Sequence, residues 1–177
     1  MITARKVALR QKRLTDALND YTWLTDPELA RLDATVPPVL GFAQYLRDCA
    51  GDLYLHTPDR HPFAVDTLTG QHIGNCAYYN VDLPAREAEV GIMIGNRDYW
   101  GRGYGSDAME ALVGYVFHYT GLRRLYLKTL HFNQRAQRCF RNSGFVACGD
   151  MIKGDLHFTL MELHRENWKP ALPHLNH

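Results

Sequence analysis

Trp100-Gly-Arg-Gly-Tyr-Gly105 lies between an apolar run, Val90-Gly-Ile-Met-Ile-Gly95, and a stretch of helical periodicity that begins at Ser106. A strand, a glycine-rich turn and a helix in this order aim backbone N–H groups at an anion. Glycine lets the main chain approach closely, and the first turn of a helix has unpaired donors and a partial positive charge. The segment therefore predicts a binding site for a phosphate or pyrophosphate group.

The remainder of the composition is that of an ordinary globular protein. The 177 residues suffice for one domain, and 20 basic against 19 acidic side chains predict no general attraction to nucleic acid or to a membrane surface. No apolar run reaches membrane-spanning length, and the four cysteines lack CxxC spacing, so we expect free thiols, a cytoplasmic location and no metal. We expect one domain over residues 1–168 and a C-terminal tail over 169–177.

Hydrophobic periodicity and turn residues predict a mixed α/β layout. Expected helices cover residues 13–23, a segment capped by Asp26 with Pro27 at its first position, 40–50 ended by Gly51, 105–119, and 134–142 capped by Asn133. Expected strands cover residues 6–10, 53–56, 62–66, 72–81 with a bulge at Gly74, 87–95, 124–131, 145–152 and 156–163.

Three kinds of glycine loop bind phosphates in this context. A Walker loop needs GxxxxGK followed by Ser or Thr, and this sequence has none. A dinucleotide-binding fold needs GxGxxG after its first strand, whereas here the loop lacks the last glycine and follows a series of strands. A nucleotide-binding oxidoreductase is therefore disfavoured, and the pyrophosphate loop of coenzyme A in acetyltransferases is the third option.

The second half of the chain resembles the GNAT superfamily of acetyl-CoA-dependent N-acetyltransferases, especially the branch that acetylates ribosomal-protein N-termini, spermidine and related amines. The resemblance covers about a third of the chain and depends on five segments in the same order and spacing: residues 89–95, 99–108, 133–136, 139–140 and 143–145. It implies a single α/β (α+β) domain, in which helices flank a mixed, mostly antiparallel central sheet.

The same resemblance implies the cofactor contacts. The pyrophosphate of acetyl-CoA would be held by backbone amides of Gly101, Arg102, Gly103, Tyr104, Gly105 and Ser106. Ile94 and its neighbours would bind the pantetheine arm, and Asn133 and Phe140 would touch the cofactor from the late helix. The N–H groups near Met93 and Ile94 would meet the oxyanion.

Acetyl transfer also needs a base for the amine and a proton for the departing thiolate. Glu89 is the candidate base, since related enzymes often carry an acid there; strand alternation places it opposite Val90 and on the face of Met93. An ordinary ion-paired strand glutamate is the equally weighted alternative, and Glu87 is the second choice for the base. Phe140 occupies the position where many relatives have a tyrosine acid, which leaves Tyr126, Tyr104 or water to protonate the thiolate.

The acceptor is expected between the first two helices, at residues 19–38. Asp20, Asp26, Glu28 and Asp33 could attract a cationic amine, and Tyr21 and Trp23 could cover its body, although a plain helix pair explains the same residues. An acetyltransferase acting on a small amine or a protein N-terminus is the favoured function. A non-catalytic module that binds coenzyme A or a partner stays open because of Phe140, and a homodimer is compatible with strand edges expected late in the chain.

Overall fold

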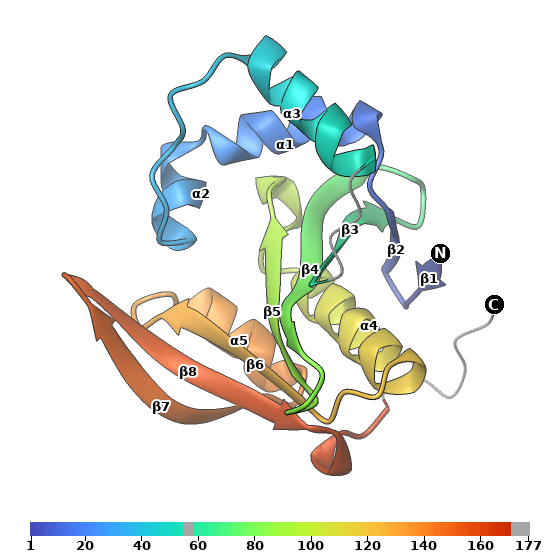
Figure 1. Ribbon diagram of the computed structural model, residues 1–177, viewed down its shortest axis with the longest axis vertical. Coiled ribbons are helices and arrows are strands. Elements are labelled where there is room, and N and C mark those ends of the chain that lie inside the picture. Colours follow the sequence, from blue (N-terminus) through green and yellow to red (C-terminus); the bar gives the residue numbers. More distant parts are fainter. Residues whose placement is uncertain (55–58, 171–177) are drawn as a thin grey trace.

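One eight-stranded sheet runs through the protein, in the strand order β1-β2-β3-β4-β5-β6-β8-β7 (Figure 1). The structure is a computed structural model and describes residues 1–54 and 59–170. All strand pairs are antiparallel except β5–β6, which is parallel. The strands are β1 (Ile2–Thr3), β2 (Val7–Gln11), β3 (Arg60–Thr67), β4 (His72–Asp82), β5 (Glu87–Ile94), β6 (Arg124–Leu130), β7 (Val146–Lys153) and β8 (Leu156–His164).

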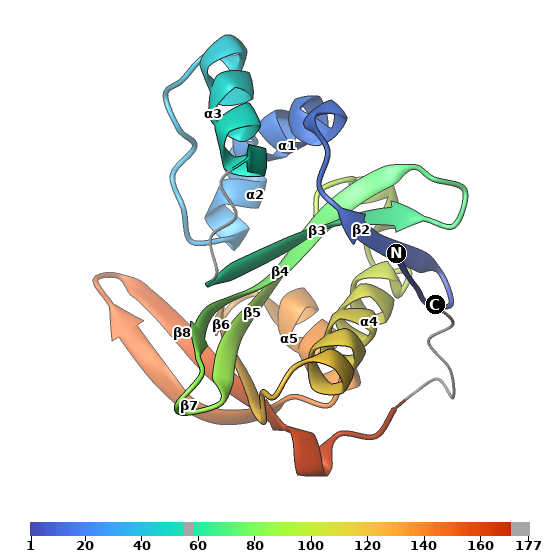
Figure 2. The ribbon, with the colours of Figure 1, turned by 45° about the vertical axis from the view of Figure 1, so that its right-hand side comes forward.

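The helices form two groups (Figure 2). On one side of the sheet, α4 (Tyr104–Tyr119) packs against β1, β2, β4 and β5, with α5 (Gln134–Asn142) beside it. Near the end of β5, α1 (Ala17–Leu24), α2 (Pro27–Leu32) and α3 (Phe42–Tyr54) pack on one another. No helix in the described part of the chain is long and apolar enough to cross a membrane.

The core lies between α4 and the sheet. Met109, Leu112 and Phe117 on α4 are fully buried and belong to one cluster with Val90 of β5 and Leu125 of β6. Burial of a side chain of this size stabilises the fold by about 1.5–3 kcal/mol. The apolar stripe expected on this helix is therefore confirmed. Because Val90 of β5 packs on this stripe, the residues next to it on β5 face away from α4.

Most expected elements are confirmed, with small shifts at their ends. Asp26 caps α2 by accepting hydrogen bonds from the N–H groups of Glu28 and Leu29, at 2.9 and 3.0 Å. Asn133 caps α5 through the N–H of Ala136 at 3.2 Å. The bulge expected at Gly74 appears as a register shift between Val65↔Gly74 and Asp66↔His72.

Two expectations near residue 50 are wrong. The helix does not stop at Gly51 but continues to Tyr54, so residues 53 and 54 are helical rather than the start of a strand. The remainder of that expected strand, residues 55 and 56, lies outside the described part of the chain, as does most of the expected tail from residue 171 onward. One interior glycine costs a helix only about 1 kcal/mol, which the rest of a 13-residue helix can outweigh.

The sheet opens in its middle. β5 pairs with β6 only from Glu87↔Arg124 to Glu89↔Tyr126. Beyond this point β6 pairs with β8 alone. In the described part of the chain, no strand pairs with this edge of β5 after Glu89. The opening leaves backbone groups of β5 free to bind another extended chain or a ligand.

Candidate active site

The glycine loop adopts the conformation that the sequence predicts. Gly101 and Gly103 have φ values of +70° and +84°, in the region that residues with a Cβ rarely occupy. Gly103 is the N-cap of α4, and no side chain caps this helix. The first N–H groups of α4 are therefore available to an anion, and the helix dipole reinforces the attraction.

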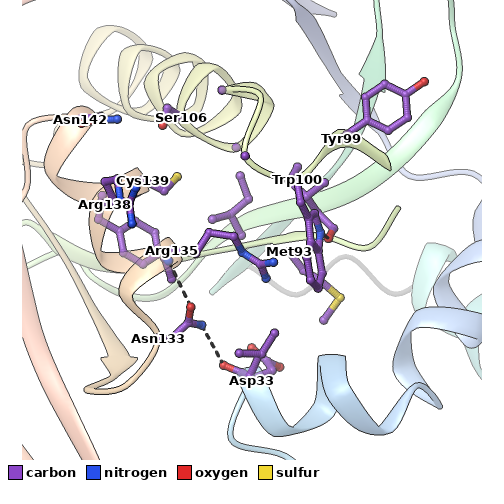
Figure 3. A pocket seen from close by; sticks show the side chains of 18 of the residues that line it. Asp33, Met93, Tyr99, Trp100, Ser106, Asn133, Arg135, Arg138, Cys139 and Asn142 are labelled. Carbon is purple, nitrogen blue, oxygen red and sulfur yellow. Dashed lines mark hydrogen bonds between the residues drawn. The ribbon is translucent and has the colours of Figure 1, made fainter. Parts of the chain in front are cut away.

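A pocket of about 300 Å³ adjoins this loop (Figure 3). Its walls come from the C-terminal half of β5, the glycine loop, α5 and the end of α2. It is lined by Leu29, Leu32, Asp33, Ile92, Met93, Ile94, Tyr99, Trp100, Gly101, Gly103, Gly105, Ser106, Asn133, Arg135, Ala136, Arg138, Cys139, Phe140 and Asn142. Eight of the ten expected cofactor residues line it; Arg102 and Tyr104, which were expected to contribute backbone amides, do not.

Trp100 and Arg135 form one wall of the pocket. The Trp100 indole donates a hydrogen bond of 2.6 Å to the carbonyl oxygen of Ile94, which ties the loop to the end of β5. The Arg135 guanidinium lies 3.3 Å from the centroid of the Trp100 ring. Burial lowers the pKa of Arg135, since its charge is partly removed from water. The negative charge of a bound anion would stabilise the charged form of Arg135.

The α5 wall carries Arg138 as a second cation, and Figure 3 shows both arginines on this helix beside the pocket. Sequence reasoning missed them because it read α5 only through its cap and its apolar side. The arginines at i and i+3 share one face of a helix, a signal that was present in the sequence. Phe140 is buried and packs edge-on against Phe145, so it serves as an apolar wall.

Glu89 lies where β5 and β6 separate, on the face of the sheet opposite α4. Its side chain is 6 % exposed. The carboxylate accepts a hydrogen bond of 2.9 Å from Asn80 Nδ2 and lies 3.1 Å from Lys128 Nζ. It is therefore an ion-paired glutamate, which is one of the two readings that the sequence leaves open, and it lies at the last paired position before β5 and β6 part. Glu87 is further from the opening and pairs with Arg124 at 2.7 Å.

Tyr79 is a residue that sequence reasoning did not single out. Tyr79 is directly opposite Glu89 in the β4–β5 pair, and burial together with the charge of the Glu89 carboxylate raises the pKa of its hydroxyl. A Cβ on Gly91 would lie only 3.3 Å from this hydroxyl, so the glycine makes room for it. Tyr126 pairs with Glu89 from β6, and burial raises its pKa too. Tyr104 instead packs edge-on against Tyr99.

The expected substrate residues of the first helices are engaged in packing and ion pairs. The Tyr21 hydroxyl donates to the carbonyl oxygen of Leu40 at 2.9 Å, which links α1 to the segment before α3. Trp23 is 8 % exposed and packs against the His72 ring and Gly95. Glu28 lies 3.1 Å from Arg97 and is half-exposed.

The acidic side chains of this region differ in whether they are neutralised. Asp20 lies 2.5 Å from Lys12 Nζ, and Asp26 lies 2.7 Å from Arg97. Asp33 has no ion-pair partner in the described part of the chain and lines the pocket near Tyr79. Asp33 is an exposed residue, so water solvates its carboxylate. Of the four expected acids, Asp33 is the one that lines the pocket.

An open sheet, a glycine loop at a helix N-terminus and a cleft beside the parted strands together define an acyl-coenzyme A transferase type of site. The sequence matches the family model described as an acetyltransferase (GNAT) domain over residues 6–146, which is most of the chain. The protein therefore belongs to the GNAT acetyltransferase family and is an acyltransferase, an N-acetyltransferase of GNAT type. This confirms the resemblance seen in the motifs.

Individual relatives agree with this assignment. An uncharacterized N-acetyltransferase p20 of Bacillus licheniformis is 27% identical over 124 residues, which cover 70% of this chain and 69% of that protein. The spermidine N-acetyltransferase of Vibrio cholerae, solved with CoA and spermine, superposes with a TM-score of 0.80 at 19% identity, over 91% of this chain and 96% of that one. The aminoglycoside acetyltransferase AAC(6')-Ib, solved with coenzyme A, gives 0.75 at 21% identity over 91% and 96%. These two structures confirm the expected fold.

Proposed function

We propose that the protein transfers the acetyl group of acetyl-CoA to a primary amine by direct attack in a ternary complex. The observation that carries this proposal is one pocket that joins the glycine loop to the unpaired edge of β5. The pocket begins at the glycine loop and two arginines, which suit a pyrophosphate, and runs along β5 as far as Ile92; Glu89 lies beyond it on the same strand, where β5 and β6 part. A long ligand with an anionic end and a reactive end fits this arrangement.

Each end of the cleft has a role in this proposal. The N–H groups of residues 101–106 and the cations Arg135 and Arg138 hold the phosphates. The pantetheine arm lies beside Ile92–Ile94, on the edge of β5 that no described strand covers. The N–H groups near Met93 and Ile94 stabilise the oxyanion that forms on the acetyl carbonyl.

The reaction then proceeds on the face opposite α4. The amine nitrogen attacks the acetyl carbonyl carbon, the carbon–sulfur bond breaks, and the nitrogen loses a proton to Glu89 directly or through a water. The departing thiolate takes a proton from the Tyr79 hydroxyl or from water. The raised pKa of Tyr79 keeps this hydroxyl protonated at neutral pH, so it is available as a donor.

The charges of the cleft favour an acceptor with one cationic amine close to the reacting nitrogen. Asp33 is the one of the four expected acids that lines the pocket, and its exposed carboxylate attracts an ammonium group by its charge. The Vibrio cholerae structure holds spermine, a polycation. Here Asp20 and Asp26 are already paired with Lys12 and Arg97, which leaves fewer acids to recognise further positive charges.

Measurements of turnover and of acetyl-CoA binding distinguish an enzyme from a module that only binds coenzyme A. Thiol release from acetyl-CoA is followed with a panel of monoamines, polyamines, aminoglycosides and peptides, and mass spectrometry identifies the acetylated products. Release with at least one amine supports the proposal. Saturable binding of acetyl-CoA without release on any amine supports the module instead.

The role of Asp33 is tested with two matched variants. Asp33→Asn should raise KM for the amine about tenfold or more and change the Kd of acetyl-CoA much less, because a carboxylate on the pocket wall attracts the cationic amine and not the cofactor phosphates. Asp155→Asn, in the exposed turn between β7 and β8, should change neither quantity. An equal change in both variants would remove Asp33 from the acceptor site.

We also propose that two copies of the chain pair along β7 as a homodimer. β7 is an edge strand, and Val146 and Ile152 on it are 61 % and 76 % exposed. Edge strands with exposed apolar side chains are surfaces through which two copies can pair. Sedimentation equilibrium of the protein and of Ile152→Lys tests this: a dimer that dissociates in the variant supports it, and a monomer at all concentrations contradicts it.

A further inference from the structure

Three side chains with metal-binding atoms meet on the surface away from the acetyl-CoA pocket. His131 follows β6, Asp150 lies on β7 and His157 lies on β8, so three adjacent parts of the sheet each supply one. One ligand atom from each residue lies within 4.8 Å of the other two. All three residues are exposed, which leaves access for an ion and for water.

The backbone holds these residues together. The N–H of His131 donates a hydrogen bond of 2.8 Å to the carbonyl oxygen of His157, which fixes the end of β6 against β8. Asp150 pairs with Thr159 in the β7–β8 ladder. The two imidazole rings lie parallel, with an angle of 1° and centroids 4.4 Å apart. Two of the three residues therefore lie on strands, and the third lies in the turn directly after β6, held to β8 by a backbone hydrogen bond.

One pair of the proposed ligand atoms already has a spacing close to that of a coordination sphere, and the third ligand has a polar neighbour on the same strands. His157 Nε2 lies 3.2 Å from Asp150 Oδ1, and His131 Nδ1 lies 3.1 Å from the Thr159 hydroxyl. Zinc binds imidazole nitrogen and carboxylate oxygen at about 2.0–2.2 Å, so two ligands at a tetrahedral angle are about 3.3–3.5 Å apart. All three side chains are exposed, so the two parallel imidazole rings have room to turn toward a common point with Asp150, which they must do to share one ion.

The donor set also selects the kind of ion. Two imidazole nitrogens and one carboxylate suit Zn²⁺ and similar divalent transition metals, with water completing the sphere. Mg²⁺ and Ca²⁺ prefer all-oxygen ligands and are poorly matched. We propose that His131, Asp150 and His157 form a surface site for Zn²⁺ or a similar transition-metal ion that ties the end of β6 to the β7–β8 hairpin. Sequence reasoning expected no metal because no ligand pair has a metal-site spacing along the chain.

Calorimetric titration of the full chain tests the site. The protein carries no affinity tag, is stripped with a chelator and is titrated with ZnCl2, then separately with MgCl2 and CaCl2. Zn²⁺ should bind saturably at one ion per chain and raise the melting temperature, while Mg²⁺ and Ca²⁺ should do neither. No saturable heat with Zn²⁺, or equal binding of Mg²⁺, overturns the proposal.

Three substitutions separate this site from general binding to surface histidines. His157→Asn and His131→Asn each remove a ligand and should weaken Zn²⁺ binding at least about tenfold, as loss of even an outer-sphere partner can do. His164→Asn is the matched control, because His164 also lies beside an acid, Glu162 at 3.5 Å, but outside the cluster. If the control weakens binding as much as the other two, the assignment is wrong. Circular dichroism of each variant confirms that the fold is intact.

Discussion

Glu89→Gln is the substitution that most directly tests the chemistry. The amide has nearly the shape of the carboxylate but cannot take the proton of an attacking amine. General-base catalysis contributes about 10²–10⁴-fold, so kcat should fall by about that factor, which corresponds to about 3–5 kcal/mol in the barrier. Acetyl-CoA affinity should stay unchanged, because Glu89 does not line the pocket.

The structure predicts a small effect of the same substitution on stability. The amide oxygen of Gln can still accept the hydrogen bond from Asn80, and the contact that is lost is the one with Lys128. The Lys128 side chain is 47 % exposed, so its charge returns to water and the lost pair is worth about 1 kcal/mol or less. A large loss of turnover with a small loss of stability therefore identifies a chemical role.

The assay compares two glutamates on the same strand and face. Steady-state thiol release gives kcat, calorimetry gives the Kd of acetyl-CoA, and urea unfolding gives stability. Glu87→Gln is the control: Glu87 also forms an ion pair, with Arg124, which keeps Glu162 as a second partner. Unchanged turnover of Glu89→Gln at neutral pH refutes its role as the base, and a loss found only in Glu87→Gln moves the role to that residue.

Further substitutions test the pocket, the packing and the buried thiol. Gly105→Trp should abolish acetyl-CoA binding because Gly105 lines the pocket, whereas Gly121→Trp, in open space, should bind normally by calorimetry. Gly95→Ala places a Cβ 2.0 Å from the buried α1 tryptophan and should lower the melting temperature, whereas Gly114→Ala meets its nearest neighbour at 3.7 Å and should not. Burial raises the pKa of Cys76 to about 12, so the native state keeps a proton that the unfolded state loses above its ordinary value near pH 9. Stability should therefore decrease by about 1.4 kcal/mol per pH unit from this group in that window, and urea unfolding should show a shallower alkaline decrease in Cys76→Ala than in the unchanged protein.

Local signals were sufficient for much of the fold. Asp26 with Pro27 marked the start of α2, Asn133 marked the start of α5, and the apolar stripe of α4 identified the face that packs on the sheet. Each of these signals depends on neighbours within one or two turns of helix. The end of α3 was misjudged because an interior glycine is only a weak signal against a helix, and the hydrophobic contacts of that helix outweigh it.

The sequence by itself determined the family, the glycine-rich turn before α4 and the strand that carries Glu89, because these depend on short segments with fixed spacing. Only the tertiary structure decided which acid of the first helices keeps a free carboxylate, since Lys12 and Arg97 reach Asp20 and Asp26 from elsewhere in the chain. It also decided that Tyr79 meets Glu89. Tertiary structure likewise decided that His131, Asp150 and His157 meet. Contacts between side chains far apart in sequence depend on strand register and helix placement, which no local pattern encodes.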